Sequence, residues 1–380
     1  MADSRVIQIA MPDMGDEEWH ALREPLQTGW LTQGPKVAAF EKAFASRHRV
    51  RHARASTSCT TALHLILAAL EIGPGDEVIL PAFTWVATAN VIVYCGATPV
   101  FVDIDHTTFN IDPAQVAARV TPRTRAVIAV HLFGLCADMD ALRKAAPGIP
   151  IIEDAACAAG AAYNGKPAGG LGLAAAFSFH PRKSITTGEG GMVTTDDEGL
   201  AERVNMLRNH GVGTSEEIRH RGPKPFLLAD FPLIGFNYRM TDLQGAVGLV
   251  QLGKLDRYID ERQRWAEFYA RELAGMPWLR LPAAPEGRRH GWQSYVCLVD
   301  SRKAPKPRNT IMELLLQKGV HTRPGTHAVH MLSCYRERYG LKPDDFPVAR
   351  ECDAWSMAIP LHNRMSAEDY GHVVRSIQGL

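Results

Sequence analysis

The 380-residue chain carries 42 basic and 41 acidic residues, and its formal net charge of +1 excludes a strong whole-molecule attraction to nucleic acid or to a membrane surface. Hydrophobic residues make up 46% and charged residues 22%, as in an ordinary globular protein. A chain of this length predicts two unequal domains rather than one core. We therefore expect small-molecule substrates, with no nucleic acid and no membrane among the partners.

The seven cysteines lie apart, at positions 59, 95, 136, 157, 297, 334 and 352, and none forms a CxxC pair. This spacing argues against a disulfide framework and against a zinc site, so we expect no metal. No apolar run approaches the roughly 20 residues of a membrane helix, and the first residues lack the pattern of a signal peptide. The sequence predicts a cytoplasmic protein.

Residues 36 to about 195 alternate helical and strand patterns. The segments KVAAFEKAFASRH, TTALHLILAALEI and DMDALRKAAP predict helices, whereas EVILPAF, TRAVIAVHLFG and IPIIEDAA predict buried strands. The charged run RHRVRHAR, at 47–54, is interpreted as a solvated helix end. Such alternation is typical of an α/β fold with a mostly parallel sheet, which binds ligands at the carboxyl ends of its strands.

The pattern changes after the stretch RMTDLQGAVGLVQLGKLDRYIDERQRWAEFYARELAG. That stretch predicts one long amphipathic helix or two abutting helices, and PWLRLPAAPEG after it is interpreted as a linker. The later segments SYVCLVD, TIMELLLQKGV, CDAWSMAIPLH and AEDYGHVVRSIQ predict a smaller α+β domain. We place a large α/β domain with its N-terminal segment at 1–250 and the small domain at 251–380.

One lysine, Lys183, lies between the strand-like residues FSF and the glycine-rich turn GEGG. A lysine in such a loop commonly extends its amine to solvent, but it can also trap a carbonyl compound. Asp154 ends a predicted buried strand, where a carboxylate is costly unless paired; alone, it would be interpreted as a helix N-cap. Together the two side chains form the pair that pyridoxal phosphate requires, an amine for the Schiff base and a carboxylate for the pyridine nitrogen.

A phosphate site is also suggested by the sequence. Residues 58–61, which include Cys59 and Thr60, precede a long predicted helix, so hydroxyls and backbone N–H groups would face an anion there. An ordinary helix cap explains the same residues. Ser178 would add a hydroxyl, and Trp85, just after a strand, fits either a ring stacked on the cofactor or a core aromatic.

Ten segments in order resemble the DegT/DnrJ/EryC1/StrS family of pyridoxal-phosphate-dependent sugar aminotransferases. They are GWLTQGPKVAAFEKAFA, SCTTALHL, PAFTWVATAN, PVFVDID, VHLFG with ADMDAL, IIEDAACAAGA, FSFHPRKSITTGEGGMVTT, LRNHG, GFNYRMTDLQGAVGLVQL and RPGTHAVH. The resemblance extends from about Gly29 to Leu361. It implies a fold-type-I aminotransferase and a homodimer whose active sites lie at the subunit interface.

The resemblance also implies roles for individual residues. Lys183 matches the Schiff-base lysine, Asp154 the partner of the pyridine nitrogen, and Trp85 the aromatic that stacks on the ring. Thr60 and Ser178 match phosphate ligands, with the backbone of the turn around position 59 beside them.

Two further positions bear on the cofactor. Asn237 matches an asparagine that reaches the phosphate of the neighbouring subunit, although by itself it would be interpreted as a turn residue. Cys157 stands where many relatives carry glutamine, asparagine or histidine, and its thiol is a weak donor, so another group or water would make the contact to the cofactor's 3-hydroxyl. Cys59 replaces the commoner glycine of the phosphate turn.

The resemblance implies that L-glutamate gives its amino group to the cofactor and a keto sugar then takes it, whereas a branch acting on cyclitols uses glutamine. GEGG resembles members that aminate C4 of nucleotide-linked 4-keto-6-deoxy sugars, and RPGTHAVH resembles perosamine-type enzymes. We therefore expect a nucleotide-diphosphate-linked 4-keto-6-deoxyhexose as the substrate. Another ring position, or a keto-cyclitol with glutamine as donor, is the alternative.

Four residues are candidates for contact with the substrate: His180, Glu189, Arg239 and His327. Each also has a structural interpretation, and His327 equally fits a cap of the following segment. Family members that dehydrate their sugar carry histidine at the lysine position, whereas this chain keeps Lys183. A non-enzymatic regulator that binds pyridoxal phosphate is the alternative from another class, and the absence of a basic helix-turn-helix extension disfavours it.

Overall fold

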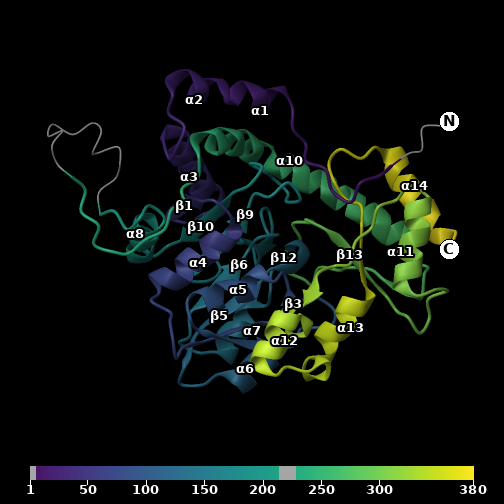
Figure 1. The fold of residues 1–380 in the computed structure, drawn as a ribbon. Coiled ribbons are helices and arrows are strands. Elements are labelled where there is room, and N and C mark those ends of the chain that lie inside the picture. The colour runs from purple at the N-terminus through teal and green to yellow at the C-terminus, as the bar shows by residue number, and fades with distance from the viewer. Residues whose placement is uncertain (1–5, 214–227) are drawn as a thin grey trace.

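A seven-stranded sheet forms the centre of the larger part of the protein, whose computed structural model describes residues 6–213 and 228–380 (Figure 1). The order is β1-β10-β9-β6-β5-β2-β4, in which β9, β6, β5, β2 and β4 pair in parallel and β10 is antiparallel to both neighbours. The strands are β1 (His52–Ser56), β2 (Glu77–Pro81), β4 (Thr98–Val102), β5 (Thr124–Val130), β6 (Ile151–Asp154), β9 (Ala174–Ser178) and β10 (Gly191–Thr195). The predicted α/β fold with a mostly parallel sheet is confirmed.

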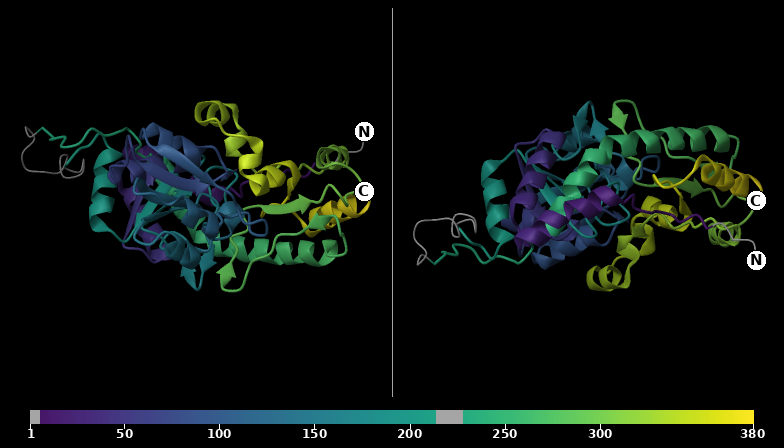
Figure 2. Two further views of the ribbon diagram at one scale, coloured as in Figure 1. Left: turned by 90° about the horizontal axis from the view of Figure 1, so that it is seen from below. Right: turned by 90° about the horizontal axis from the view of Figure 1, so that it is seen from above.

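Helices cover both faces of this sheet (Figure 2). Successive residues of β5 point to opposite faces, so Ile128 packs in one core and Val127 in the other. The first core contains α4 (Cys59–Ala69), α5 (Ala87–Tyr94) and α8 (Glu198–Leu207). The second contains α3 (Pro35–His48), α6 (Pro113–Arg119), α7 (Met139–Ala145) and the first part of α10 (Asp242–Leu273). Burial on both faces explains why the parallel strands are almost wholly apolar.

The long stretch that begins with RMTDLQ forms one helix, α10, which starts at Asp242 and runs from the large sheet to the C-terminal part of the chain (Figure 1). Its last turns bury Tyr269 and Leu273 in a third core, which also includes Ile7 near the N-terminus. The boundary predicted between residues 250 and 251 falls inside α10, so the division into two domains stays a prediction.

The C-terminal part combines helices with a three-stranded antiparallel sheet in the order β11-β13-β15. Its elements are β11 (Leu279–Arg280), β13 (Tyr295–Val299), α11 (Arg308–Gln317), η2 (Val329–Met331), α12 (Ser333–Tyr339), η3 (Pro343–Asp345), α13 (Pro347–Trp355), β15 (Ser356–Ile359) and α14 (Ala367–Gln378). The segment interpreted as a linker, PWLRLPAAPEG, contains the edge strand β11.

Smaller elements connect these parts. The strand β3 (Phe83–Thr84) pairs with β14 (His327–Ala328), and a second small sheet has the order β12-β7-β8. The remaining elements are α1 (Asp16–Ala21), α2 (Arg23–Thr28), η1 (Leu132–Gly134), β7 (Ala162–Tyr163), β8 (Lys166–Pro167) and β12 (Arg288–Arg289). No helix in residues 6–213 or 228–380 is long and apolar enough to cross a membrane.

The charged run at 47–54 is not simply a solvated helix end. The helix α3 ends at His48, whose side chain is fully buried and stacks on Phe44 with ring centroids 4.2 Å apart. The chain then turns through Arg49, in the left-handed conformation, and enters β1 at His52. The interpretation was wrong because the chain turns back at once, which places part of the charged run in the core and in the sheet.

Candidate active site

Asp154 and Lys183 come together at the carboxyl edge of the parallel strands. Asp154 is the last residue of β6, and its backbone is in register with Val130 of β5 and Ala176 of β9. Ser178 ends β9, and Lys183 follows in the loop to β10. Parallel strands end at the same edge, so the strand order β5-β6-β9 places these side chains beside one another.

The Asp154 carboxylate is 5% exposed and has few partners for a buried charge. One oxygen accepts a hydrogen bond from the Thr88 hydroxyl at 2.8 Å, and the other accepts the Ala156 N–H at 3.2 Å and lies 3.9 Å from Cys59 Sγ. Burial raises the pKa of Asp154 above its ordinary value, although the Thr88 hydrogen bond opposes this. A cation beside the carboxylate would restore its charge. No helix follows Asp154, so it is not an N-cap.

The Lys183 side chain turns inward, because its Nζ donates a hydrogen bond to Cys157 Sγ at 3.2 Å. Burial lowers the pKa of the Lys183 amine, but the Cys157 sulfur raises it, and the pKa lies above its ordinary value. The loop is closed at its base, where the Thr186 hydroxyl donates to the Phe179 carbonyl at 2.8 Å. Gly188 adopts a left-handed φ of 85° that lets the loop turn back. The interpretation of Lys183 as a solvent-facing lysine is therefore wrong.

The start of α4 provides donors for an anion. Ser58 is the N-cap and accepts the Thr61 N–H at 3.1 Å, whereas the N–H groups of Cys59 and Thr60 have no acceptor among the described residues. These two free donors lie at the positive end of an 11-residue helix. A Cβ at Gly191 would lie 2.2 Å from the Ser58 carbonyl, so glycine is needed for β10 to approach this turn.

Trp85 lies outside the core, with 60% of its surface exposed. It precedes α5, and its carbonyl accepts the N–H of Thr88, the residue that contacts Asp154. Its indole lies against His327, with ring centroids 5.7 Å apart at an angle of 42°, because β3 pairs with β14. The core interpretation of Trp85 is wrong. His327 is not a cap, because Ala328 precedes the next helical turn.

Two substrate candidates lie in or beside the lysine loop. His180 Nδ1 accepts the Arg182 N–H at 3.2 Å, and burial lowers the pKa of His180 while the nearby Glu189 raises it. Glu189 is exposed. The Ser178 hydroxyl oxygen accepts the His180 N–H at 3.4 Å, so the end of β9 and the loop are joined.

Asn237 and Arg239 lie elsewhere in the chain. Asn237 is exposed and forms a backbone bridge with Asn209, whose side-chain oxygen accepts a hydrogen bond from Arg239 Nη1 at 2.6 Å. Within the described residues, no hydrogen bond or ion pair joins either residue to Lys183 or Asp154.

Glu153 and His131 support this edge of the sheet, and sequence reasoning missed both. The Glu153 carboxylate is fully buried and accepts hydrogen bonds from His131 Nε2 at 2.9 Å and from the backbone N–H groups of Gly169, Leu171 and Gly172 at 2.7, 2.6 and 2.7 Å. Burial raises the pKa of Glu153, but the His131 hydrogen bond and the backbone donors bring it below its ordinary value. Strand alternation was the available signal, since it places Glu153 on the face opposite Asp154.

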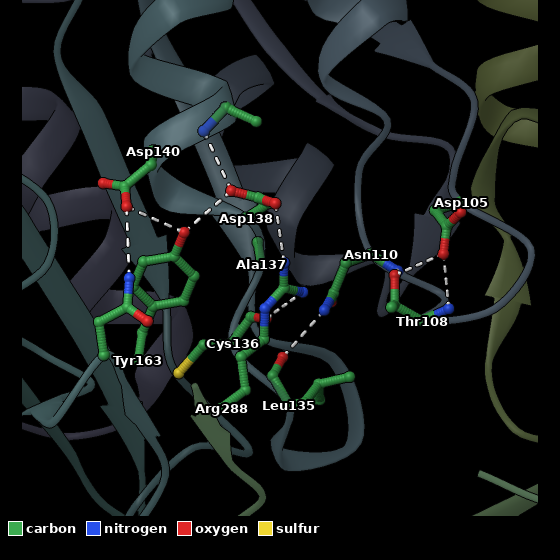
Figure 3. A network of polar contacts seen from close by, with 12 residues as sticks. Asp105, Thr108, Asn110, Leu135, Cys136, Ala137, Asp138, Asp140, Tyr163 and Arg288 are labelled. Carbon is green, nitrogen blue, oxygen red and sulfur yellow. Dashed lines mark hydrogen bonds and ion pairs between the residues drawn. The ribbon is translucent and has the colours of Figure 1, made fainter. Parts of the chain in front are cut away.

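The segment after β5 is held by a polar network (Figure 3). The Asn110 side chain donates to the Leu135 carbonyl at 3.0 Å, and Arg288 pairs with Asp138 at 2.8 Å. The Tyr163 hydroxyl also donates to Asp138, at 3.0 Å. These contacts join residues 135–138, which follow β5, to Asn110, β7 and β12.

Comparison with known proteins identifies this arrangement. The DegT/DnrJ/EryC1/StrS aminotransferase family matches residues 12–378. The chain belongs to this family.

Relatives in the family include proteins of similar length. The GDP-perosamine synthase of Caulobacter vibrioides is 39% identical over 382 residues, covering 99% of both chains. The spore coat polysaccharide biosynthesis protein SpsC of Bacillus subtilis is 40% identical over 378 residues, covering 98% of this chain and 96% of its own. The PLP-form of the putative sugar aminotransferase Spr1654 from Streptococcus pneumoniae is a similar solved structure, with a TM-score of 0.91, 28% identity and 98% coverage of each chain.

This family member is a pyridoxal-phosphate-dependent sugar aminotransferase, with a sugar and an amino donor as its substrates. The residues present fit the cofactor. The helix start offers two open N–H donors for a phosphate, the Asp154 carboxylate forms no ion pair within residues 6–213 and 228–380, and Lys183 supplies an amine nearby. Among the described residues, no group of three or more histidines, cysteines, aspartates or glutamates is placed to hold a metal ion.

Proposed function

We propose that this enzyme transfers the amino group of L-glutamate to C4 of a nucleotide-linked 4-keto-6-deoxyhexose, and that it works as a homodimer with shared active sites. The placement of Lys183 and Asp154 at neighbouring strand ends carries the aminotransferase chemistry. The similarity to the GDP-perosamine synthase and the GEGG segment support the substrate.

Each residue has a proposed task. Bound pyridoxal phosphate supplies an aldehyde that holds the amino group and a ring that accepts electrons. Lys183 binds that aldehyde and, once displaced by the donor, moves the proton between the donor's α-carbon and the cofactor. Asp154 keeps the ring nitrogen protonated, and Trp85 covers the ring. The N–H groups of Cys59 and Thr60 hold the phosphate.

Two side chains complete the phosphate site in this proposal. The Ser178 hydroxyl comes from the end of β9 in the same subunit, and the Asn237 amide comes from the second subunit. The exposed position of Asn237 leaves its amide open to a neighbouring copy and supports this task. Substrate contacts are assigned to His180, Glu189 and Arg239, with His327 beside Trp85.

The substrate is tested with a panel of nucleotide-linked keto sugars and keto-cyclitols, offered with L-glutamate or L-glutamine. Mass spectrometry follows the replacement of the keto oxygen by an amine. Amination of a 4-keto-6-deoxyhexose with glutamate as donor is expected. Preferred amination of a 3-keto sugar, or of a cyclitol with glutamine, would replace the proposed substrate and leave the aminotransferase assignment intact.

All seven cysteines are free thiols, which supports a reducing compartment, and we therefore propose that the enzyme works in the cytoplasm.

The substitution Asp154→Asn tests the partner of the ring nitrogen. The variant is expected to keep cofactor on Lys183 but to turn over about 100-fold more slowly, because an unprotonated ring is a poor electron acceptor. Steady-state kinetics and borohydride trapping measure the two properties. Turnover within about twofold of the wild type would remove this role from Asp154.

Mixed dimers test the position of Asn237. One subunit carries Lys183→Ala with an intact Asn237, and the other carries Asn237→Ala with an intact Lys183. If Asn237 acts in the neighbouring subunit, one site of the mixed dimer receives both intact residues and the other receives neither. We therefore expect about half of the wild-type activity, with normal affinity for the cofactor.

The measurement is a titration of pyridoxal phosphate into purified mixed dimers that carry different affinity tags. Action of Asn237 within its own subunit gives a different result, because the site with an intact Lys183 then carries the altered asparagine. All residual activity would in that case need a raised cofactor concentration, as in the Asn237→Ala homodimer, which serves as the reference.

A further inference from the structure

Two buried hydroxyls form a chain that ends on the Asp154 carboxylate. The Thr88 hydroxyl lies 2.8 Å from one carboxylate oxygen of Asp154, and the Thr84 hydroxyl lies 3.0 Å from that of Thr88. Both threonines are shielded from bulk water, since 0% of Thr88 and 1% of Thr84 is exposed. Within residues 6–213 and 228–380, neither hydroxyl has a further hydrogen-bond partner.

The direction of this chain follows from the group at its end. An ionised carboxylate only accepts hydrogen bonds, so the single proton of the Thr88 hydroxyl points to Asp154 and Thr84 must donate to Thr88. A proton on that Asp154 oxygen would reverse both hydroxyls, and the Thr84 proton would then have no acceptor among the described residues. A buried donor without an acceptor is costly, so the chain favours Asp154 as an acceptor.

The local geometry of residues 84–88 builds the chain. A threonine in a helix commonly donates to the backbone carbonyl four residues earlier, which would consume its proton. Thr88 lies in the first turn of α5, and its partner four residues earlier is the side chain of Thr84, at the end of β3. The same segment carries Trp85, whose carbonyl accepts the Thr88 N–H at 3.1 Å. The aromatic proposed to cover the ring and the hydroxyl that holds Asp154 therefore belong to one turn of the chain.

The other oxygen of Asp154 has weaker support. It accepts the Ala156 N–H at 3.2 Å and lies 3.9 Å from Cys59 Sγ. Burial raises the pKa of Asp154, and the Thr88 hydrogen bond is the first of the contacts that lower it. The bond from Thr88 is also the shortest that this carboxylate accepts within the described residues.

We propose that Thr84 and Thr88 are positioning residues of the aminotransferase, and that their hydroxyl chain presents the Asp154 carboxylate as a hydrogen-bond acceptor to the ring nitrogen of bound pyridoxal phosphate. The inference rests on the proposed role of Asp154 as the partner of that nitrogen. Both threonines act through Asp154. By holding the carboxylate as an acceptor, they keep the proton on the ring nitrogen and the ring a good acceptor of electrons.

The substitution Thr88→Val removes the hydroxyl and keeps the branched shape of the side chain. It is expected to weaken binding of pyridoxal phosphate about tenfold and to lower kcat about tenfold, because the carboxylate loses a charge-assisted hydrogen bond. Thr88→Ser keeps a hydroxyl and should restore both values to within about twofold of the wild type. Titration of stripped enzyme with pyridoxal phosphate, followed by absorbance, and steady-state kinetics measure the two effects. Equal values for Thr88→Val and Thr88→Ser would overturn the proposal.

Thr195→Val is the matched control. Thr195 is 2% exposed, and its hydroxyl donates to the Leu173 carbonyl at 2.7 Å, at the end of β9 opposite to Ser178. This variant loses a buried hydrogen bond of the same kind, so denaturant unfolding should show a loss of stability, while cofactor affinity stays within about twofold of the wild type. Cofactor binding weakened as much as in Thr88→Val would assign the effect to general destabilisation and contradict the proposal.

Thr84→Val tests the far end of the chain. It should weaken cofactor binding about threefold, less than Thr88→Val, because Thr88 still reaches Asp154 but is no longer polarised by a second hydroxyl. In an Asp154→Asn background, neither threonine substitution should weaken cofactor binding further by more than about twofold. Thr84→Val alone gives this result if Thr88→Val does not fold. Undiminished losses in that background would show that the hydroxyls act independently of Asp154, and the proposal would be wrong.

The Asp154→Asn variant separates failure of this inference from failure of the proposed role of Asp154. Slow turnover of Asp154→Asn with normal cofactor affinity and turnover of Thr88→Val contradicts only the inference. Turnover of Asp154→Asn within about twofold of the wild type removes the role of Asp154, and the inference with it.

Discussion

The substitution Lys183→Ala is expected to lower transamination by at least about 10⁴-fold, because in the proposed mechanism the residue both binds the cofactor aldehyde and moves the reacting proton. Among the described residues, no other lysine contacts Cys157 or Asp154, so no second amine is placed to replace it. The variant should still fold and bind the cofactor through its phosphate and ring. Steady-state kinetics with glutamate and a keto sugar measure the loss.

Borohydride reduction followed by peptide mapping gives an independent readout for the same residue. Wild-type enzyme should carry the reduced cofactor on Lys183, whereas the Lys183→Ala variant should release all of its cofactor on denaturation. Lys166→Ala is the control, since Lys166 is exposed on β8 and should leave both labelling and turnover unchanged. A label on any lysine other than Lys183 would refute the assignment.

The main elements and the proximity of Asp154 to Lys183 could be predicted because their signals are local. Helical spacing marks α3 and α4, continuous apolar runs mark β2, β5 and β6, and Lys183 stands within a segment typical of the family. The order of parallel strands then brings Asp154 close to Lys183, since Asp154 ends β6 and Lys183 follows β9, and the two strands end at the same edge.

Contacts between distant segments could not be predicted in this way. The hydrogen bond from Thr88 to Asp154 joins α5 to β6, and the contact of Lys183 with Cys157 depends on the path of two loops. Neither of these two contacts produces a periodic pattern of residues in the sequence. The task proposed for Asn237 needs a second copy of the chain, so neither its own sequence neighbours nor one subunit reveals it.

Glu153 shows how such contacts support the site. Its carboxylate holds residues 169–172, which lead into β9, the strand that ends at Ser178 and continues into the lysine loop. Its neighbour Asp154 faces the candidate site from the same strand. One buried charge, on the face of β6 opposite Asp154, therefore holds two strands whose ends lie at the candidate site.

The substitution Glu153→Gln is expected to lower the free energy of unfolding by about 3 kcal/mol at pH 7. Each carboxylate oxygen accepts two hydrogen bonds, one oxygen from Leu171 and Gly172 and the other from Gly169 and His131. The amide NH₂ of glutamine is a donor, so two buried donors would face it without an acceptor. Denaturant unfolding of cofactor-stripped protein measures the change.

The pH dependence of this stability difference tests whether the charge of Glu153 causes the stabilisation. The folded-state pKa of Glu153 lies below its ordinary value of 4.5, so its ionisation contributes stability that is complete above pH 4.5 and is lost as the pH falls through the folded value. The difference between wild type and Glu153→Gln should therefore be largest at neutral pH and shrink in acid. Glu313→Gln, on the exposed side of α11, should change stability by less than about 0.5 kcal/mol. A Glu153→Gln variant as stable as this control, or a difference that grows in acid, would show that Glu153 is not the charged anchor of the two strands.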